Sequence, residues 1–415
     1  MTSPAYDPRV VTLLLCDRSG GLLGTLPPAE SAVPYWPEVG DVVAEVRERY
    51  AADVAVLRLL STGAEPGTHG GPVTYLAELL DGSPPAGLTR WPGPDPTPDH
   101  PLRLPYARPG GPAAEVAWAD AQLQAAGRPR TARAEQVRTW NLSSIWRLPT
   151  AEGAVWLKSV PPFFAHEGAM LRRLDPDAVP PLVATEGPRV LLDEVPGVDH
   201  WGGELPVLLR VLELLVRLQV EWVPRTAELL EVGAPDWRAP QLVPAVEDLV
   251  DRAGGPLDDD VRRGLDALVS GLPGRLADVA GCGVPDTLVH GDFHPGNTRG
   301  SPVDGGRSVL LDWGDCGLGN PLLDQAAFLA SIAEQQREPV RERWVDLWRA
   351  AVPGSDPIRA ARLLTPVAAL RQALIYQIFL DGIEPDERVY HAADPAHWLA
   401  RAVAGAADAP AGTSG

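Results

Sequence analysis

Lysine is almost absent from this sequence. Of 36 basic residues only Lys158 is a lysine, and every other one is arginine. Basic residues are also outnumbered, because 55 acidic residues give a net charge of −19. Nucleic-acid binding needs basic patches, so the charge argues against a nucleic-acid partner. An acidic surface would attract a cationic small molecule, but acidity also serves solubility, and both interpretations stay open.

Cysteine is scarce too. Cys16, Cys282 and Cys316 are odd in number and show neither paired nor metal-ligand spacing, which predicts free thiols in a reducing cytoplasm. Residues 1–7 lack the basic region and apolar core of a signal peptide. The longest apolar stretch, residues 205–220, is interrupted by charges, which predicts an amphipathic helix and no membrane partner.

Two short motifs carry the chemistry. The run from His290 to Asn297 reads H-G-D-F-H-P-G-N, and L-D-W-G-D follows at residues 311–315. In phosphoryl transfer from a nucleotide, one carboxylate accepts the proton of the attacking hydroxyl, while an amide oxygen and a second carboxylate hold Mg²⁺. Asp292 is therefore predicted to be the catalytic base, with Asn297 and Asp312 as the magnesium ligands.

The single lysine fits the same chemistry. Lys158 lies in the apolar run G-A-V-W-L-K-S-V, residues 153–160, which is typical of a strand. Kinases place a phosphate-binding lysine on the third strand of the N-lobe, where its ammonium pairs with the nucleotide phosphates. A chain that has otherwise replaced lysine by arginine retains one at this place, which favours a role in binding ATP or GTP.

In their order and composition, these motifs resemble the aminoglycoside phosphotransferase family of small-molecule kinases. The resemblance covers roughly residues 130–400. It implies an α+β, bilobal protein-kinase-like fold, with a small β-rich N-lobe and a helical C-lobe. We expect a small α/β accessory domain at 1–90, a Pro/Gly-rich linker or wrapping loop at 91–112, the N-lobe at 113–200 and the C-lobe at 201–408.

The resemblance implies further site residues. A hairpin at residues 137–148 lies where kinases carry a glycine-rich loop, but its tip has no glycine. Ser143 and Ser144 are the candidates to donate hydrogen bonds to the phosphate oxygens of the nucleotide. Glu167, at the start of an expected helix, is the candidate partner of Lys158, although a solvated helix-start glutamate would look the same. For the serines, a plain polar hairpin is an equally good interpretation.

The histidines of the first motif invite a zinc interpretation, which Pro295 and the glycines argue against by excluding a helix. His290 is expected to support the loop through the backbone, and no role is assigned to His294. Asp324, at the start of a helix, is expected to be structural and, with His290, to support the loop. Asp315 is a candidate to lie next to the metal ligands without binding the ion itself.

The N-terminal part faintly resembles a Nudix hydrolase domain, with a strand, a hairpin and a helix containing Arg47-Glu48. Nudix enzymes need further glutamates just after that pair, and Ala51 and Ala52 stand there. The resemblance therefore implies a catalytically silent accessory domain.

The sequence predicts a cytoplasmic kinase that moves the γ-phosphate of ATP or GTP to a hydroxyl of a small molecule. A nucleotide-binding pseudokinase acting through its N-terminal domain is the alternative, and intact Lys158, Asp292, Asn297 and Asp312 argue against it. An enzyme with two functions, carrying a hydrolase in front, is disfavoured by the missing glutamates.

Overall fold

A computed structural model describes residues 8–63, 69–252, 257–303 and 306–408. These residues form two units that interleave along the chain. The first takes the chain up to Ala165, then Leu182–Glu194 and Phe379–Ala393, and the second takes His166–Pro181, Val195–Ile378 and the chain from Asp394. Residues 1–7, which carry the prediction about a signal peptide, lie outside the described part.

The first unit opens with a five-stranded sheet in the order β2-β1-β5-β4, with β3 pairing on β1. β1 and β5 run parallel, whereas β4 and β5 form a long antiparallel pair. The elements of this part are β1 (Arg9–Cys16), β2 (Leu22–Thr25), β3 (Ala29–Ser31), α1 (Gly40–Tyr50), β4 (Asp53–Thr62) and β5 (Gly71–Asp81).

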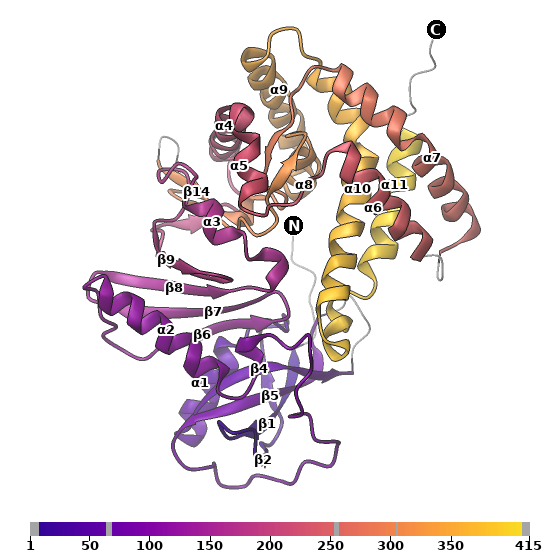
Figure 1. Cartoon of the computed structure of the whole chain (residues 1–415). Coiled ribbons are helices and arrows are strands. Elements are labelled where there is room, and N and C mark those ends of the chain that lie inside the picture. The colour runs from indigo at the N-terminus through magenta and orange to yellow at the C-terminus, as the bar shows by residue number, and fades with distance from the viewer. Residues whose placement is uncertain (1–7, 64–68, 253–256, 304–305, 409–415) are drawn as a thin grey trace. The chain divides into compact units, whose positions relative to one another are not determined.

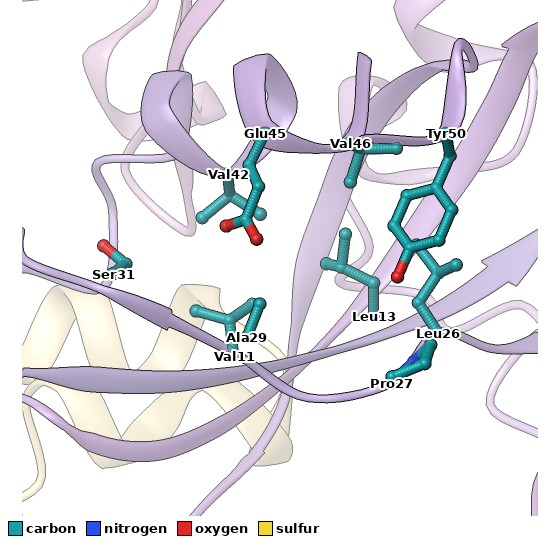
Figure 2. A pocket seen from close by; sticks show the side chains of 10 residues that line it. All are labelled: Val11, Leu13, Leu26, Pro27, Ala29, Ser31, Val42, Glu45, Val46 and Tyr50. Atoms are coloured by element: carbon teal, nitrogen blue, oxygen red, sulfur yellow. The ribbon is translucent and has the colours of Figure 1, made fainter. Parts of the chain in front are cut away.

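Helix α1 forms because its apolar residues recur on one face, and it buries that face on the sheet. Figure 2 shows Val42 and Val46 pointing from the helix toward Val11 and Leu13 of β1. The helix ends at Ala51, whose φ of 50° is left-handed and whose N–H donates to the carbonyl of Arg47 at 3.0 Å. Only a cavity of about 20 Å³ remains between helix and strand, which is room for one water.

A second five-stranded sheet of the same unit is antiparallel along its whole order, β6-β7-β8-β10-β9 (Figure 1). The hairpin of β6 and β7 turns at residues 141–142. The elements are η1 (Pro105–Ala107), α2 (Gly111–Ala125), β6 (Glu135–Trp140), β7 (Ser143–Thr150), β8 (Gly153–Ser159), η2 (Pro162–Phe164), β9 (Leu182–Glu186), β10 (Arg189–Asp193) and, from the C-terminal part, η5 (Pro385–Tyr390).

The two sheets of the first unit are joined through the buried side chain of Gln136. Its Nε2 donates to the carbonyl of Val56 at 2.8 Å, and its Oε1 accepts from the N–H of Val56 at 2.8 Å. The side-chain amide thus makes with Val56 the two hydrogen bonds that the backbone of a neighbouring strand would make. The N–H of Thr139 also donates to the carbonyl of Pro37 at 2.9 Å. The N-terminal sheet and the hairpin sheet are therefore one structural body.

Residues 91–104, which we call the wrapping loop, contain no helix or strand, while η1 and the start of α2 occupy the end of the range 91–112 that the sequence assigned to a linker or wrapping loop. Trp91 packs against the cluster of Leu14, Cys16, Leu57 and Leu76 on one face of the N-terminal sheet. This covering loop explains why β4 and β5 are buried on both faces for most of their length.

The second unit is mostly helical. Short antiparallel strand pairs, β12 with β15 and β13 with β14 and β11, lie among its helices (Figure 1). The elements are α3 (Glu167–Leu171), β11 (Val198–Asp199), α4 (Leu205–Trp222), η3 (Val223–Arg225), α5 (Thr226–Glu231), α6 (Ala239–Arg252), α7 (Asp259–Gly281), β12 (Thr287–Val289), η4 (Pro295–Asn297), β13 (Thr298–Gly300), β14 (Ser308–Leu310), β15 (Gly317–Gly319), α8 (Leu323–Ser331), α9 (Glu334–Ala351), α10 (Pro357–Gly382) and α11 (Asp394–Asp408).

One helix of the described chain, α10, is long and apolar enough to cross a membrane by length and composition. In its most apolar window 61% of the residues are buried inside the protein, as in the core helix of a globular protein. It therefore gives no indication of a membrane span. The predicted fold class is confirmed, because a β-rich N-terminal part is followed by a helical C-terminal part.

Candidate active site

The H-G-D-F-H-P-G-N motif forms a loop between β12 and β13 in the second unit, and its first residue ties it to the next motif. His290 is fully buried, and its Nε2 lies 3.0 Å from the carbonyl oxygen of Leu311. Burial lowers the pKa of His290 to about 4, so the ring is neutral and donates from Nε2. This contact holds the residue before Asp312 against the loop, which is the supporting position predicted for His290.

Asp324, at the start of α8, anchors the backbone of the same loop. Its carboxylate accepts from the N–H of His290 at 2.9 Å, from the N–H of Gly291 at 2.8 Å and from Nε2 of Gln219 at 2.9 Å. Desolvation outweighs these donors and raises its pKa to about 6. The carboxylate thus lies against the loop that Asp324 is expected to support.

Gly291 is required at its position. Its φ is 93°, and an added Cβ would lie 2.1 Å from the carbonyl oxygen of Asp315. The buried Arg371 of α10 fixes both segments, since its guanidinium donates to the carbonyls of Gly291 at 3.2 Å and Asp315 at 3.3 Å. It also stacks over Trp237, 4.7 Å from the ring centroid.

The carboxylate of Asp292 is held on one oxygen. Its Oδ2 accepts from Nδ2 of Asn297 at 2.9 Å, and Nε2 of His294 lies 3.5 Å from the same oxygen. Nδ1 of His294 accepts from the N–H of Gly296 at 3.1 Å, so the neutral ring carries its proton on Nε2, facing Asp292. Among the described residues no donor contacts Oδ1, and the side chain is 46% exposed. Asp292 can therefore accept a proton through Oδ1.

Asn297 and Asp312 come together through backbone pairing. The N–H of Leu311 donates to the carbonyl of Asn297 at 2.8 Å, and β13 pairs with β14 directly behind them. Asp312 itself has a φ of 59°, a left-handed conformation that is rare for a residue with a side chain. Such strain is concentrated at functional sites. Because Nδ2 of Asn297 is engaged by Asp292, its Oδ1 is the atom that remains for a cation.

Trp201 lies beside this loop and was not found from the sequence. Its ring stacks on His294, with centroids 5.0 Å apart and planes 19° apart, and it is 58% exposed. The strand β11 brings it there by pairing with β13, and the N–H of His200 donates to the carbonyl of Pro295 at 3.1 Å. Trp201 therefore presents an exposed aromatic surface beside His294.

Lys158 lies on β8, the central strand of the hairpin sheet, and is paired with Ile145 and Val190. This is the third strand of that sheet in chain order, as the sequence predicted. Glu167 is buried at the start of α3, and its Oε1 accepts from the N–H of Trp313 at 3.2 Å. Since the lysine belongs to the first unit and the glutamate to the second, their pairing stays a prediction.

The two hairpin serines are more enclosed than a polar tip would be. Ser143 is 6% and Ser144 2% exposed. Their hydroxyls accept from the indole N–H groups of Trp140 at 3.0 Å and Trp146 at 3.1 Å. Each hydroxyl therefore orients a tryptophan of the hairpin, and contact with a nucleotide stays a prediction.

A model of the phosphotransferase enzyme family matches residues 136–361, which is more than half of the chain. The chain belongs to this phosphotransferase family. The match includes Lys158, Asp292, Asn297 and Asp312, and it begins after the N-terminal sheet. The Nudix resemblance of that N-terminal part is not shown by any comparison.

Among solved structures, the phosphotransferase resembles the apoenzyme of a macrolide 2′-phosphotransferase from Brachybacterium faecium, with 18% identity over 68% of this chain and 97% of the other and a TM-score of 0.47. A choline kinase from Streptococcus pneumoniae is 15% identical over 70% and 98%, with a TM-score of 0.49. A thermostable aminoglycoside phosphotransferase mutant, in a ternary complex with ADP and hygromycin B, is 17% identical over 72% and 100%, with a TM-score of 0.48. No curated protein matches the chain. The family assignment rests on the family model.

Proposed function

We propose that this phosphotransferase moves the γ-phosphoryl group of ATP or GTP to a hydroxyl of a small molecule. The observation that carries the proposal is the geometry of Asp292, whose Oδ2 is held by Asn297 and His294 while Oδ1 is left to accept a proton. Phosphoryl transfer needs little covalent help from the protein, so a base with a fixed orientation and charge neutralisation account for most of the catalysis.

In this mechanism the acceptor hydroxyl donates a hydrogen bond to Oδ1 of Asp292, which orients the hydroxyl oxygen for attack. As the bond from this oxygen to the γ-phosphorus forms, the bond from the γ-phosphorus to the β–γ bridging oxygen breaks, ADP or GDP leaves, and Oδ1 takes the hydroxyl proton. The Nε2–H of His294 and the amide of Asn297 steady the carboxylate. Backbone contacts from Asp324 and Arg371 fix the loop that carries it. A shift of about 1 Å in such a loop lowers the rate about 100-fold.

On the nucleotide side, we propose that Lys158 pairs with the phosphates and that Glu167 orients its ammonium. The hairpin with Ser143 and Ser144 covers the same phosphates. Lys158 is suited to this role because a compact ammonium can reach two phosphate groups from a rigid strand.

Asn297 and Asp312 fit a magnesium ion, because an amide oxygen and a carboxylate are hard oxygen donors. The described residues contain no group of three or more His, Cys, Asp or Glu side chains that could hold a metal ion. Two ligands suffice when nucleotide phosphates supply the others, as is usual for Mg²⁺. When bound, the ion would neutralise charge on the phosphate oxygens.

The acceptor we propose is a small hydroxylated molecule. Its cationic character stays a prediction from the net charge of −19. The reducing cytoplasm is the compartment we propose, since the three cysteines are free and buried. Burial raises the pKa of the Cys16 thiol to about 12, so it is not reactive.

For the N-terminal sheet we propose a structural role and no hydrolase activity. Ala51 and Ala52 stand where the Nudix resemblance would need metal-binding glutamates, and Arg47 of α1 pairs with Asp53 at 2.9 Å. The alternative of a pseudokinase acting through this part is not favoured by any observation of the site.

The decisive experiment measures release of ADP from Mg-ATP and of GDP from Mg-GTP against aminoglycosides, macrolides, choline, homoserine and sugars. Asp292→Asn is measured in parallel, because it keeps the shape of the side chain and removes the base. Turnover that depends on an acceptor and vanishes in the variant would support the proposal. Failure of the wild-type protein to bind either Mg-nucleotide would overturn it.

A further inference from the structure

The chain leaves the second unit at Ile378 and returns at Asp394, and the excursion between them, residues 379–393, packs entirely within the first unit. We call this excursion the C-terminal strap. Its beginning is fixed by aromatic contacts, since Phe379 stacks on Phe163 with ring centroids 5.4 Å apart. Gly382 also lies close to the ring of Phe163, because a Cβ added to this glycine would be only 2.9 Å from a ring carbon.

Two arginines from the N-terminal part hold the middle of the strap. Arg103 of the wrapping loop makes a two-pronged ion pair with Glu384, at 2.9 and 2.8 Å, and each side chain is 5% exposed. Arg58 of β4 lies 3.6 Å from Asp386 and also donates to the carbonyl of Pro96 at 2.7 Å. The strap is therefore seated by residues that precede the family match.

The end of the strap reaches the turn of the β6–β7 hairpin. Nδ2 of Asn141 donates to the carbonyl of Glu387 at 3.1 Å, and Oδ1 of Asn141 lies 3.2 Å from Nε2 of His391. With Nδ2 committed to a carbonyl, Oδ1 must be the acceptor, so His391 donates from Nε2. Asn141 is 1% exposed, and both polar ends of its amide are satisfied by the strap.

Aromatic rings close the same contact. Tyr390 lies edge-on to Trp36 and to Trp140, with centroids 5.6 Å apart in both pairs. The hydroxyl of Tyr106 donates to the carbonyl of Trp140 at 2.8 Å. Trp140, the last residue of β6, is thus held by contacts with both Tyr106 and the strap.

The turn at residues 141–142 contains no glycine, the residue that gives such a loop its flexibility. The residues of the strap that hydrogen-bond to Asn141 lie outside residues 136–361, the range that the family model matches. We propose that the C-terminal strap preorganises the nucleotide-covering hairpin, with Asn141 as the positioning residue and His391 as its partner. This inference rests on the proposed function, because it assigns the hairpin to Mg-ATP or Mg-GTP. A turn that is already ordered loses little conformational freedom when the nucleotide binds.

The test combines Mg-ATP and Mg-GTP titrations by calorimetry with amide hydrogen exchange of the peptide around residues 139–146, on the full chain. Asn141→Ala and His391→Leu remove the two ends of the contact. His391→Gln restores a donor to Oδ1 of Asn141. His100→Leu is the matched control, since Nδ1 of His100 accepts a local hydrogen bond from the N–H of Leu102 at 3.2 Å, within the wrapping loop.

We expect Asn141→Ala and His391→Leu to weaken nucleotide binding by about 5- to 30-fold and to speed exchange in the hairpin, because each leaves a buried polar partner unsatisfied. His391→Gln and His100→Leu should stay within about threefold of the wild-type Kd. The KM of the acceptor should be unchanged while the Kd of the nucleotide rises, whereas a general loss of folding would lower the apparent kcat and the number of binding sites and leave that Kd unchanged.

Unchanged Kd and unchanged exchange in Asn141→Ala would overturn the inference, and so would tighter binding, which would make the strap a restraint on nucleotide entry. If the wild-type protein binds neither Mg-nucleotide, the proposed function falls and this role falls with it. The exchange data then still report whether the strap holds the hairpin, so the two failures are distinguishable.

Discussion

The substitution Asp324→Asn has two opposing effects on stability: it removes a buried charge, and it removes a hydrogen bond that holds the catalytic loop. At pH 7 the buried carboxylate, with its pKa raised from 3.8 to about 6, costs about 3 kcal/mol relative to the unfolded chain. A neutral amide avoids that cost. It also loses at least one of the three donors now satisfied by Asp324, since one oxygen becomes an NH2 group, and that costs about 1–3 kcal/mol.

The two effects are of similar size, so we expect the unfolding free energy of Asp324→Asn to lie within about 2 kcal/mol of the wild type. Turnover should nevertheless fall about 100-fold, because the N–H groups of His290 and Gly291 set the position of Asp292. Unfolding in urea followed by tryptophan fluorescence, together with nucleoside diphosphate release at saturating nucleotide, measures both quantities. A stable variant with wild-type turnover would refute the anchoring role of Asp324.

Three further predictions concern other parts of the chain. Lys158→Arg keeps the charge but not the compact ammonium, so we expect kcat/KM for the nucleotide to fall at least about 10-fold, and retained activity in steady-state kinetics would contradict the role. Gly291→Ala places a Cβ 2.1 Å from a carbonyl of Asp315 and should abolish turnover and lower Tm in a melting experiment; a fully active variant would count against the loop geometry. Burial raises the pKa of Glu387 from 4.5 to about 8, so wild-type stability should be lost as pH rises through this window, by up to about 5 kcal/mol. Glu387→Gln, which cannot ionise, should gain relative stability from pH 5 to 8.5 in denaturant unfolding, and a constant difference would disagree.

The fold class and the site motifs could be predicted from sequence because both are local. A strand carrying Lys158 and a loop from His290 to Asn297 are each defined within ten residues, and their chemistry depends on residue type and spacing. The helix that contains Arg47-Glu48 could be predicted from its periodicity for the same reason, and it is α1 (Gly40–Tyr50).

The rest of the site depends on contacts between distant parts of the chain. Arg371 looks like an ordinary arginine of a long helix, and only the fold brings its guanidinium to the carbonyls of Gly291 and Asp315. The link that Gln136 makes between the two sheets could not be predicted, because a side-chain amide that hydrogen-bonds to the backbone produces no recognisable sequence pattern.

The C-terminal strap has a consequence for synthesis of the protein on the ribosome. Proteins generally fold from the N-terminus as domains emerge, yet the first unit here lacks residues 379–393 until translation has passed the catalytic loop and most of helix α10. Until then Arg58 and Arg103 have no strap carboxylates to pair with, and Trp36 and Trp140 lack the ring of Tyr390. A chain released early would carry the lysine strand and the catalytic loop but leave the hairpin turn uncovered. Completion of the first unit therefore requires that translation has passed residue 393, after the catalytic loop.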